Sequence, residues 1–326
     1  MQPLLRVLTI IGMTICVATP GVMSATAGET VSFPFDPATG ESRLYDVVKT
    51  RETRRNLQSD QTSTNRLTMS IPITVTGKDD QGFEMRASYN DIAITAPDAD
   101  DPAYRLATGL ARLTEGFGFE FRTTDTGVPV ALTNMEAVKT DLLPRVFAKL
   151  DDVIAHYTDN PRMAATLDPV RQAFANMSAG AGVQITLRDV LPVFSVTGIE
   201  LPLNEPLAIH REIPWELTGS NLVVTGEMKI TAINEDQATL TLSQSYTRES
   251  VRNGIAFLLS QMAGMDKASM ERTTKQLRAW EDYDIQTTIT ATLPRSGGWP
   301  TQIDHHQTFI AAGQTQTTRL SYRLAN

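Results

Sequence analysis

The sequence is nearly without cysteine. The single cysteine of the 326 residues is Cys16, which lies in an apolar run near the N-terminus. We expect this run to be removed, so the mature chain should have no disulfide, no thiol nucleophile and no thiolate metal site. Secreted eukaryotic proteins of this size commonly use disulfides, so their absence favours a bacterial envelope.

Long hydrophobic runs are missing as well. Arg6, the apolar residues 7–18 and the Ala-Thr-Ala sequence at 25–27 form the three parts of a secretory signal peptide. A membrane anchor needs about 18 apolar residues, but Thr-Pro-Gly at 19–21 interrupts the run. We expect residues 1–27 to be a signal peptide that is cleaved near Ala27. The product would be a periplasmic or secreted protein that is not an integral membrane protein.

Positive charge is scarce. The chain has 29 basic and 37 acidic residues. Only Arg6 is charged within residues 1–27, so the expected mature chain has 28 basic against 37 acidic residues, a balance of −9. Nucleic acid is therefore not an expected partner.

Motifs of known enzyme classes are absent from the sequence. It has no Gly-x-Ser-x-Gly turn and no Walker-type phosphate loop, and the glycines at 116 and 118 lack the third glycine of a dinucleotide loop. His305 and His306 are adjacent, so on a strand they point to opposite faces and cannot chelate one metal. Asp304 shares a face with His306, but a solvated strand explains this pair better than a metal site. We assign no catalytic residue, no metal ligand and no cofactor.

Alternation of apolar and polar residues is the strongest positive signal. In the first half it predicts strands at 67–75, 83–89, 117–122 and 128–132, with a less regular strand at 44–55. Polar residues at 77–82 indicate a hairpin turn. In the second half the same pattern predicts strands over 207–217, 224–230, 238–246, 285–293, 301–311 and 314–324.

Helical periodicity is confined to a few stretches. Apolar residues at spacings of three and four predict a helix over 142–157, capped by Thr140 or Asp141. Shorter helices are expected to begin at Asn160 and Asp168, and a longer helical stretch at about 250–280. The stretch from 183 to 206 is broken by proline and indicates a connector with one strand.

These elements predict an α+β fold of two antiparallel sheets, each packed against long amphipathic helices. We expect an N-terminal sheet with a helix over 28–158, a helical and proline-broken connector over 159–206, and a C-terminal sheet over 207–326 with a helical insertion at 250–280. The halves share a strand plan, which a distant duplication and common turn chemistry explain equally well. The layout resembles the open half-barrel with helices of bacterial lipoprotein carriers and related envelope lipid-binding proteins, without a shared motif.

The leading functional hypothesis is a non-enzymatic envelope protein that binds an apolar small molecule or an envelope protein between sheet and helices. The expected lining of such a cavity is aromatic and methionine-rich: Phe117, Phe119, Phe121, Phe147, Phe257, Met262 and Met265. A structural module that pairs through its sheet edges is the alternative, suggested by threonine-rich outer faces at 287–292 and 315–318. A carboxylate-based hydrolase is less favoured, because the acidic clusters at 98–101, 151–152 and 281–284 are typical of solvated surface.

Overall fold

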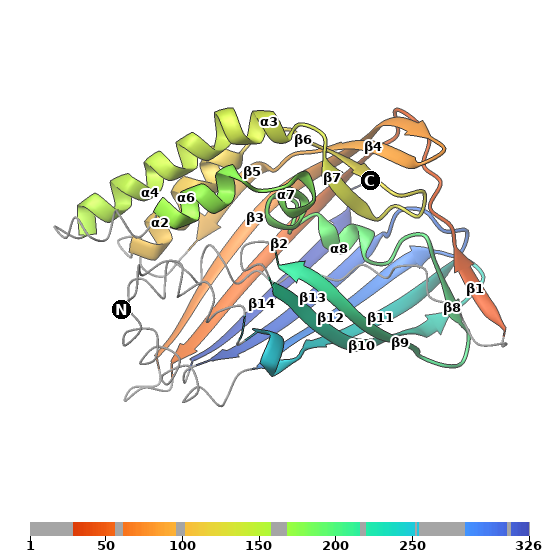
Figure 1. Ribbon diagram of the computed structural model, residues 1–326. Coiled ribbons are helices and arrows are strands. Elements are labelled where there is room, and N and C mark those ends of the chain that lie inside the picture. The colour runs from red at the N-terminus through yellow and green to blue at the C-terminus, as the bar shows by residue number, and fades with distance from the viewer. Residues whose placement is uncertain are drawn as a thin grey trace.

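The protein is built mainly from antiparallel strands (Figure 1). The computed structural model describes residues 29–55, 61–95, 102–157, 168–215, 220–251, 253, 284–311 and 314–325. Twelve strands form one large sheet and two strands form a small one. In chain order the strands are β1 (Thr30–Phe33), β2 (Ser42–Arg55), β3 (Gln61–Asp79), β4 (Gly82–Ala87), β5 (Asn90–Thr95), β6 (Phe119–Thr123), β7 (Pro129–Leu132), β8 (Ile199–Pro202), β9 (Leu207–Trp215), β10 (Ser220–Ile233), β11 (Gln237–Tyr246), β12 (Asp284–Pro294), β13 (Gln302–Ala311) and β14 (Gln314–Leu324).

The first and last strands of the larger sheet along the chain, β2 and β14, lie next to each other in its middle. Its order is β7-β6-β4-β3-β2-β14-β13-β12-β11-β10-β9, with β5 paired to β3. The chain thus runs from β2 outward to β7, crosses to β9 at the other edge, and returns strand by strand to β14. Tyr45 of β2 lies opposite Leu324 of β14, and Arg55 lies opposite Gln314. The expected two antiparallel sheets are confirmed, but both halves contribute to the larger one and the smaller is the pair β1–β8.

The two halves follow one strand plan at first. In each, a long strand turns tightly into its partner, at residues 80–81 between β3 and β4 and at 234–236 between β10 and β11. The halves then differ: β5 follows β4 after two residues and pairs with β3, and a helix precedes β6, whereas residues 247–283 separate β11 from β12. Gly82 shows why the first turn is specific: its φ is +138°, and a Cβ there would lie 2.1 Å from the carbonyl oxygen of Thr123.

The expectation of long amphipathic helices is wrong. The described helices are α2 (Pro102–Thr114), α3 (Met135–Ala137), the π-helical turn η1 (Val138–Leu142), α4 (Leu143–Tyr157), α6 (Asp168–Ala175), α7 (Ala179–Thr186) and α8 (Leu191–Phe194). The period over 142–157 is confirmed as α4, but the helical run begins at Met135, ahead of the expected caps. α2 packs on α4 and on β5, and Val146 and Phe147 of α4 pack against the hydrophobic core. Most of the expected helix at 250–280 lies outside the described residues.

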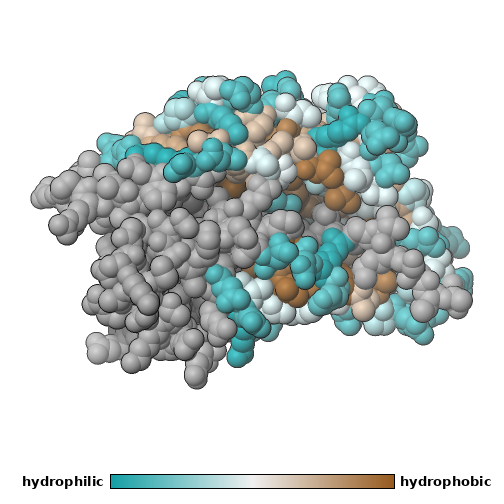
Figure 2. Space-filling view, viewed as in Figure 1, coloured by the Kyte–Doolittle hydropathy of each residue, from teal (hydrophilic) through white to brown (hydrophobic). Residues whose placement is uncertain are grey.

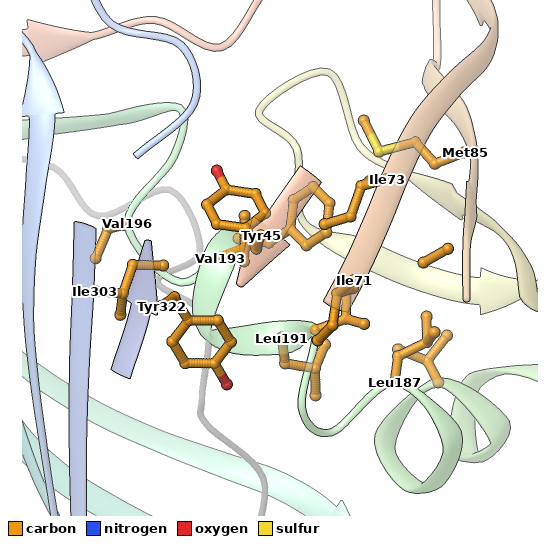
Figure 3. Close-up of a cluster of buried hydrophobic side chains, with 14 of the residues drawn as sticks. Tyr45, Ile71, Ile73, Met85, Leu187, Leu191, Val193, Val196, Ile303 and Tyr322 are labelled. Carbon is orange, nitrogen blue, oxygen red and sulfur yellow. The ribbon is translucent and has the colours of Figure 1, made fainter. Parts of the chain in front are cut away.

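The connector fills one end of the concave side of the larger sheet (Figure 1). We call residues 179–196, which include α7 and α8, the plug. Its Leu187, Leu191 and Val193 belong to one buried cluster with Tyr45, Ile71 and Tyr322 of the sheet (Figure 3). Burying each such leucine or valine stabilises the fold by about 1.5–3 kcal/mol. The buried apolar side chains of the plug are Ala181, Val183, Leu187, Val190, Leu191, Val193, Phe194 and Val196.

An aromatic cluster surrounds Phe194 at the end of the molecule where the plug lies. The Phe194 ring of the plug lies 6.1 Å from Phe35, 5.8 Å from Phe121 and 5.9 Å from Trp299, all in edge contacts. Phe35 follows β1, Phe121 lies in β6 and Trp299 lies in the turn from β12 to β13. Edge contacts add about 0.5–1.5 kcal/mol per pair beyond area burial, so the cluster joins parts of the chain that are distant in sequence.

Candidate functional site

The concave side of the larger sheet, which we call the inward face, is arranged in rows that cross the strands. Side chains that lie opposite each other in an antiparallel pair share a face. One such row is entirely apolar and lies at the plug end of the strands, where Val47, Ile303 and Tyr322 are fully buried. It runs through Met69, Val47, Tyr322, Ile303, Ala291 and Leu240.

Two rows farther along the strands the inward face becomes polar. Arg51 of β2 lies opposite Thr318 of β14, and the register carries this row across the sheet. Gln307 Nε2 donates a hydrogen bond of 3.2 Å to Thr287 Oγ1 within it. Buried polar residues normally have such a partner. The residues of this polar row are Asn65, Arg51, Thr318, Gln307, Thr287 and Gln244.

A buried ion pair stands between the apolar and the polar row. Lys49 Nζ lies 2.7 Å from Asp189 Oδ1 and 2.9 Å from Oδ2. Arg188 Nε approaches the same carboxylate at 3.8 Å. The Tyr322 hydroxyl donates to the carbonyl oxygen of Asp189 at 3.1 Å, which fixes the plug above the sheet. The side chains of Lys49 and Asp189 are only 10% and 14% exposed, so the pair is shielded from water.

The charges in this region act on one another. Burial lowers the pKa of Lys49 to about 8, although the charge of Asp189 opposes this. For Asp189, burial would raise the pKa, but the charges of Lys49 and Arg188 outweigh it and hold the pKa at about 2. Burial, and then the charge of Arg188, lower the pKa of Arg51. Three cations therefore surround one carboxylate at neutral pH.

His305 lies on the inward face, in the row between the apolar and the polar one. It is 9% exposed, and within the described part of the chain neither ring nitrogen has a hydrogen-bond partner. Burial lowers its pKa to about 4, against the opposing effect of Asp189. An unsatisfied buried imidazole costs about 1–3 kcal/mol, so this ring is a polar group without a partner inside the fold.

The sequence placed His305 and His306 on opposite faces, and this is confirmed: His306 is exposed while His305 is buried. The strand has one dry face, which holds His305, and one solvated face, which holds His306. Asp304 also faces outward, where Ser321 Oγ and Gln302 Nε2 donate to it at 2.8 Å each. Within the described residues no group of three or more histidine, cysteine, aspartate or glutamate side chains is placed to hold a metal ion.

The residues predicted to line a cavity lie in different places. Phe119 and Phe121 are fully buried on β6, and Phe117 packs at 5.0 Å from Phe119. Phe147 of α4 packs against Phe174 of α6, with ring centroids 5.7 Å apart. Their role as a ligand lining stays a prediction. The remaining three, Phe257, Met262 and Met265, lie outside the described residues.

Sequence reasoning missed the polar row. Its signal was present at 44–55, where the alternation is irregular because Tyr45 and Val47 share the inward face with Lys49 and Arg51. The threonines expected to face outward are divided as well: Thr287 and Thr318 are buried on the inward face. Such a row is indicated where a strand keeps its alternation but its inward residues change from apolar to polar.

The opening of the concave side carries apolar surface. In Figure 2, hydrophobic residues lie between the polar surface of the helices above and that of the strands below. None of the helices that the structure describes is both long and apolar enough to cross a membrane.

Comparisons with known proteins place the chain in no family. No family model matches the sequence, and no curated protein matches it. Among solved structures, one that reports lipid–protein interactions in lipovitellin has a TM-score of 0.42 and 8% identity over 89% of this chain. The match spans 25% of that structure's chain.

Two further structures have lower scores. An outer membrane lipoprotein-sorting protein domain from Vibrio parahaemolyticus has a TM-score of 0.19 and 7% identity, over 86% of this chain and 83% of its own. An outer membrane channel from Pseudomonas putida F1 has a TM-score of 0.20 and 9% identity, over 90% and 98%. At such scores these likenesses assign neither a fold nor a function to this chain.

Proposed function

We propose that this is an exported, non-enzymatic protein of the bacterial envelope that binds an apolar ligand on the inward face of its larger sheet. The observation that carries the proposal is the extent of that face. The plug covers one end of it, and the apolar side chains continue across β10, β11 and β12 beyond the plug.

The far part of the inward face is rich in apolar groups. Its buried apolar side chains do not belong to the hydrophobic cluster that the plug forms with the near part of the sheet. Buried apolar side chains on the concave side of a curved sheet are typical of the lining of a ligand cavity. In the far part these side chains are Leu222, Val224, Tyr246, Ile285 and Phe309.

The alternative, pairing through the sheet edges, has less support. The β7 edge lies against α7. The β9 edge carries Arg211, Glu212 and Pro214. Charged residues and proline on an edge strand discourage pairing with another chain, so neither edge has the features of an open docking strand.

The proposal is tested by titrating the mature chain with a fluorescent fatty acid. We expect saturable binding. Val224 and Val223 provide a matched pair, because Val224 is buried on the inward face while its neighbour points outward. Val224→Trp should weaken binding by about tenfold or more, since the indole occupies ligand space, and Val223→Trp should not.

Circular dichroism and a urea titration of both variants confirm that they are folded before binding is compared. If the wild-type chain takes up no fatty acid, or if both tryptophan variants bind as it does, the proposed site is wrong. N-terminal sequencing of the exported protein tests the signal peptide separately, with Gly28 as the expected first residue.

A further inference from the structure

The polar row lies on the inward face, between side chains that are mostly apolar. Neighbouring strands lie about 4.8 Å apart, so the row extends over roughly 20 Å of the sheet. Apolar side chains lie on both sides of it. Toward the plug are Val47 and Ile303, and on the far side are Ile285 and Phe309. A buried surface that served packing alone would have apolar residues here, because burying polar groups is costly.

Asp189 is the one carboxylate of the described residues that shifts the pKa values of both Lys49 and Arg51. It is paired with Lys49 through contacts of 2.7 and 2.9 Å. Arg51 feels the charge of Asp189 without contacting it, and within the described part of the chain it has no hydrogen bond or ion pair. The guanidinium donors of Arg51 therefore have no partner among the described residues.

His305 gives a second, independent indication of a missing partner. Its imidazole is nine-tenths buried, and both ring nitrogens are unbonded. It lies in the row next to the polar row, and Gln307 lies two residues along the same strand with its side chain on the same face. An imidazole can donate to an anion or accept from a hydroxyl. A ligand that reaches this row can satisfy it.

We infer that the polar row binds the anionic head group of an amphipathic ligand, a carboxylate or phosphate, through Arg51 and His305. The inference rests on the proposed function, since the apolar chain of the same ligand would lie across Ile285, Phe309 and Val224. Arg51 would supply the charge, because guanidinium donors match a carboxylate or phosphate in a bidentate geometry. His305 would add a hydrogen bond, and Lys49 would contribute its charge while it remains paired.

The test compares ligands that share a chain or a head group. Hexadecanoic acid, hexadecanol and acetate are titrated by calorimetry against the mature chain. We expect the acid to bind about tenfold or more tightly than the alcohol, because charge-assisted hydrogen bonds reward the carboxylate. Acetate should not compete with the acid, because it lacks the chain.

Two pairs of variants assign the effect to residues. Arg51→Gln should reduce the preference for acid over alcohol to about twofold, whereas Arg54→Gln, three residues along β2 and on its outward face, should leave it unchanged. His305→Leu should reduce the preference to a smaller extent, and His306→Leu should not. Binding of the alcohol itself should be similar in all four variants, which shows that each of them is folded.

Equal binding of acid and alcohol by the wild type would overturn the inference and leave the proposed function standing. Acetate that binds as tightly as hexadecanoic acid would also overturn it, since the row would then be a site for a free anion. If neither long-chain compound binds, the proposed function itself fails.

Discussion

The two ends of the inward face are made by the same strands and differ in chemistry. At the plug end, Tyr45 and Tyr322 are fully buried in one cluster with Leu191 and Val193 of the plug. The tyrosine hydroxyls both have backbone partners, the Tyr45 hydroxyl donating to the Pro300 carbonyl at 2.8 Å. Only a few residues farther along the strands, the same face has Arg51 and His305, whose side chains make no hydrogen bond to any other described residue. A dry, satisfied core and an unsatisfied polar row on one face indicate that the first serves stability and the second serves binding.

The largest effect should come from the plug end. Phe194→Ala removes a ring that contacts Phe35, Phe121 and Trp299. We expect the free energy of unfolding in urea to fall by about 4 kcal/mol, because the cavity is lined by rigid aromatic rings. Val130→Ala is the control, since this side chain is 44% exposed. A loss below about 1 kcal/mol for Phe194→Ala would mean that the plug is not part of the core.

The ion pair at the boundary should come next. Lys49→Met leaves Asp189 with only the longer contact to Arg188, and we expect a loss of about 3 kcal/mol in unfolding free energy. Adding Asp189→Leu to this variant should recover most of the loss, because an apolar pair of similar volume replaces a desolvated one. Equal stability of single and double variants in urea would show that the pair is solvated.

The third effect is a pH dependence that belongs to His305. Its pKa in the fold is about 4 and in the unfolded chain about 6.5. Between these values the unfolded chain binds more protons, so stability falls as the pH falls. Asp189 and Lys49, which face the ring, keep their charges throughout this window because their pKa values are about 2 and about 8.

From about pH 7 to about pH 4.5 this group should cost about 2 kcal/mol of stability. His305→Leu should flatten the curve of thermal unfolding temperature against pH by that amount, whereas His306→Leu should leave most of the slope. Parallel curves for the wild type and His305→Leu would show that the ring titrates as it does in water.

The smallest effect tests the polar row itself. Thr287→Val removes the acceptor of the Gln307 side chain, and we expect a loss of about 1 kcal/mol. Thr288→Val, the outward neighbour, should be within about 0.5 kcal/mol of the wild type. If both substitutions have the same effect in urea, the two faces of β12 do not differ as described.

The sequence predicted the elements correctly where the spacing of apolar residues alone determines whether a segment is a strand or a helix. The predicted strands at 67–75, 238–246 and 285–293 are present. Alternation is a pattern of neighbouring residues, and it is enough to specify which face of a strand is buried. The helix over 142–157 was predicted by the same kind of argument. The prediction that long helices cover each sheet was wrong, because periodicity identifies a helix but does not say what the helix packs against. The apolar stripe of α4 is shared between α2 and the edge of the hydrophobic core.

Most of the candidate site could not be predicted from the sequence. Lys49, Asp189 and His305 are separated by more than a hundred residues each, and no spacing relates them. The pairing of β2 with β14 places Lys49 and His305 two strands apart. Only the irregular pattern at 44–55 carried a signal, because inward positions there change from apolar to charged.

The amino-acid sequence by itself determined which segments are strands and which side of each is dry, because these follow from alternation over a few neighbouring residues. The tertiary structure alone decided that both halves join in one sheet, that the connector enters its concave side, and that a polar row crosses the inward face. These features depend on register between strands that are distant along the chain. Register is set by the packing of the whole sheet around the plug, which no local pattern encodes.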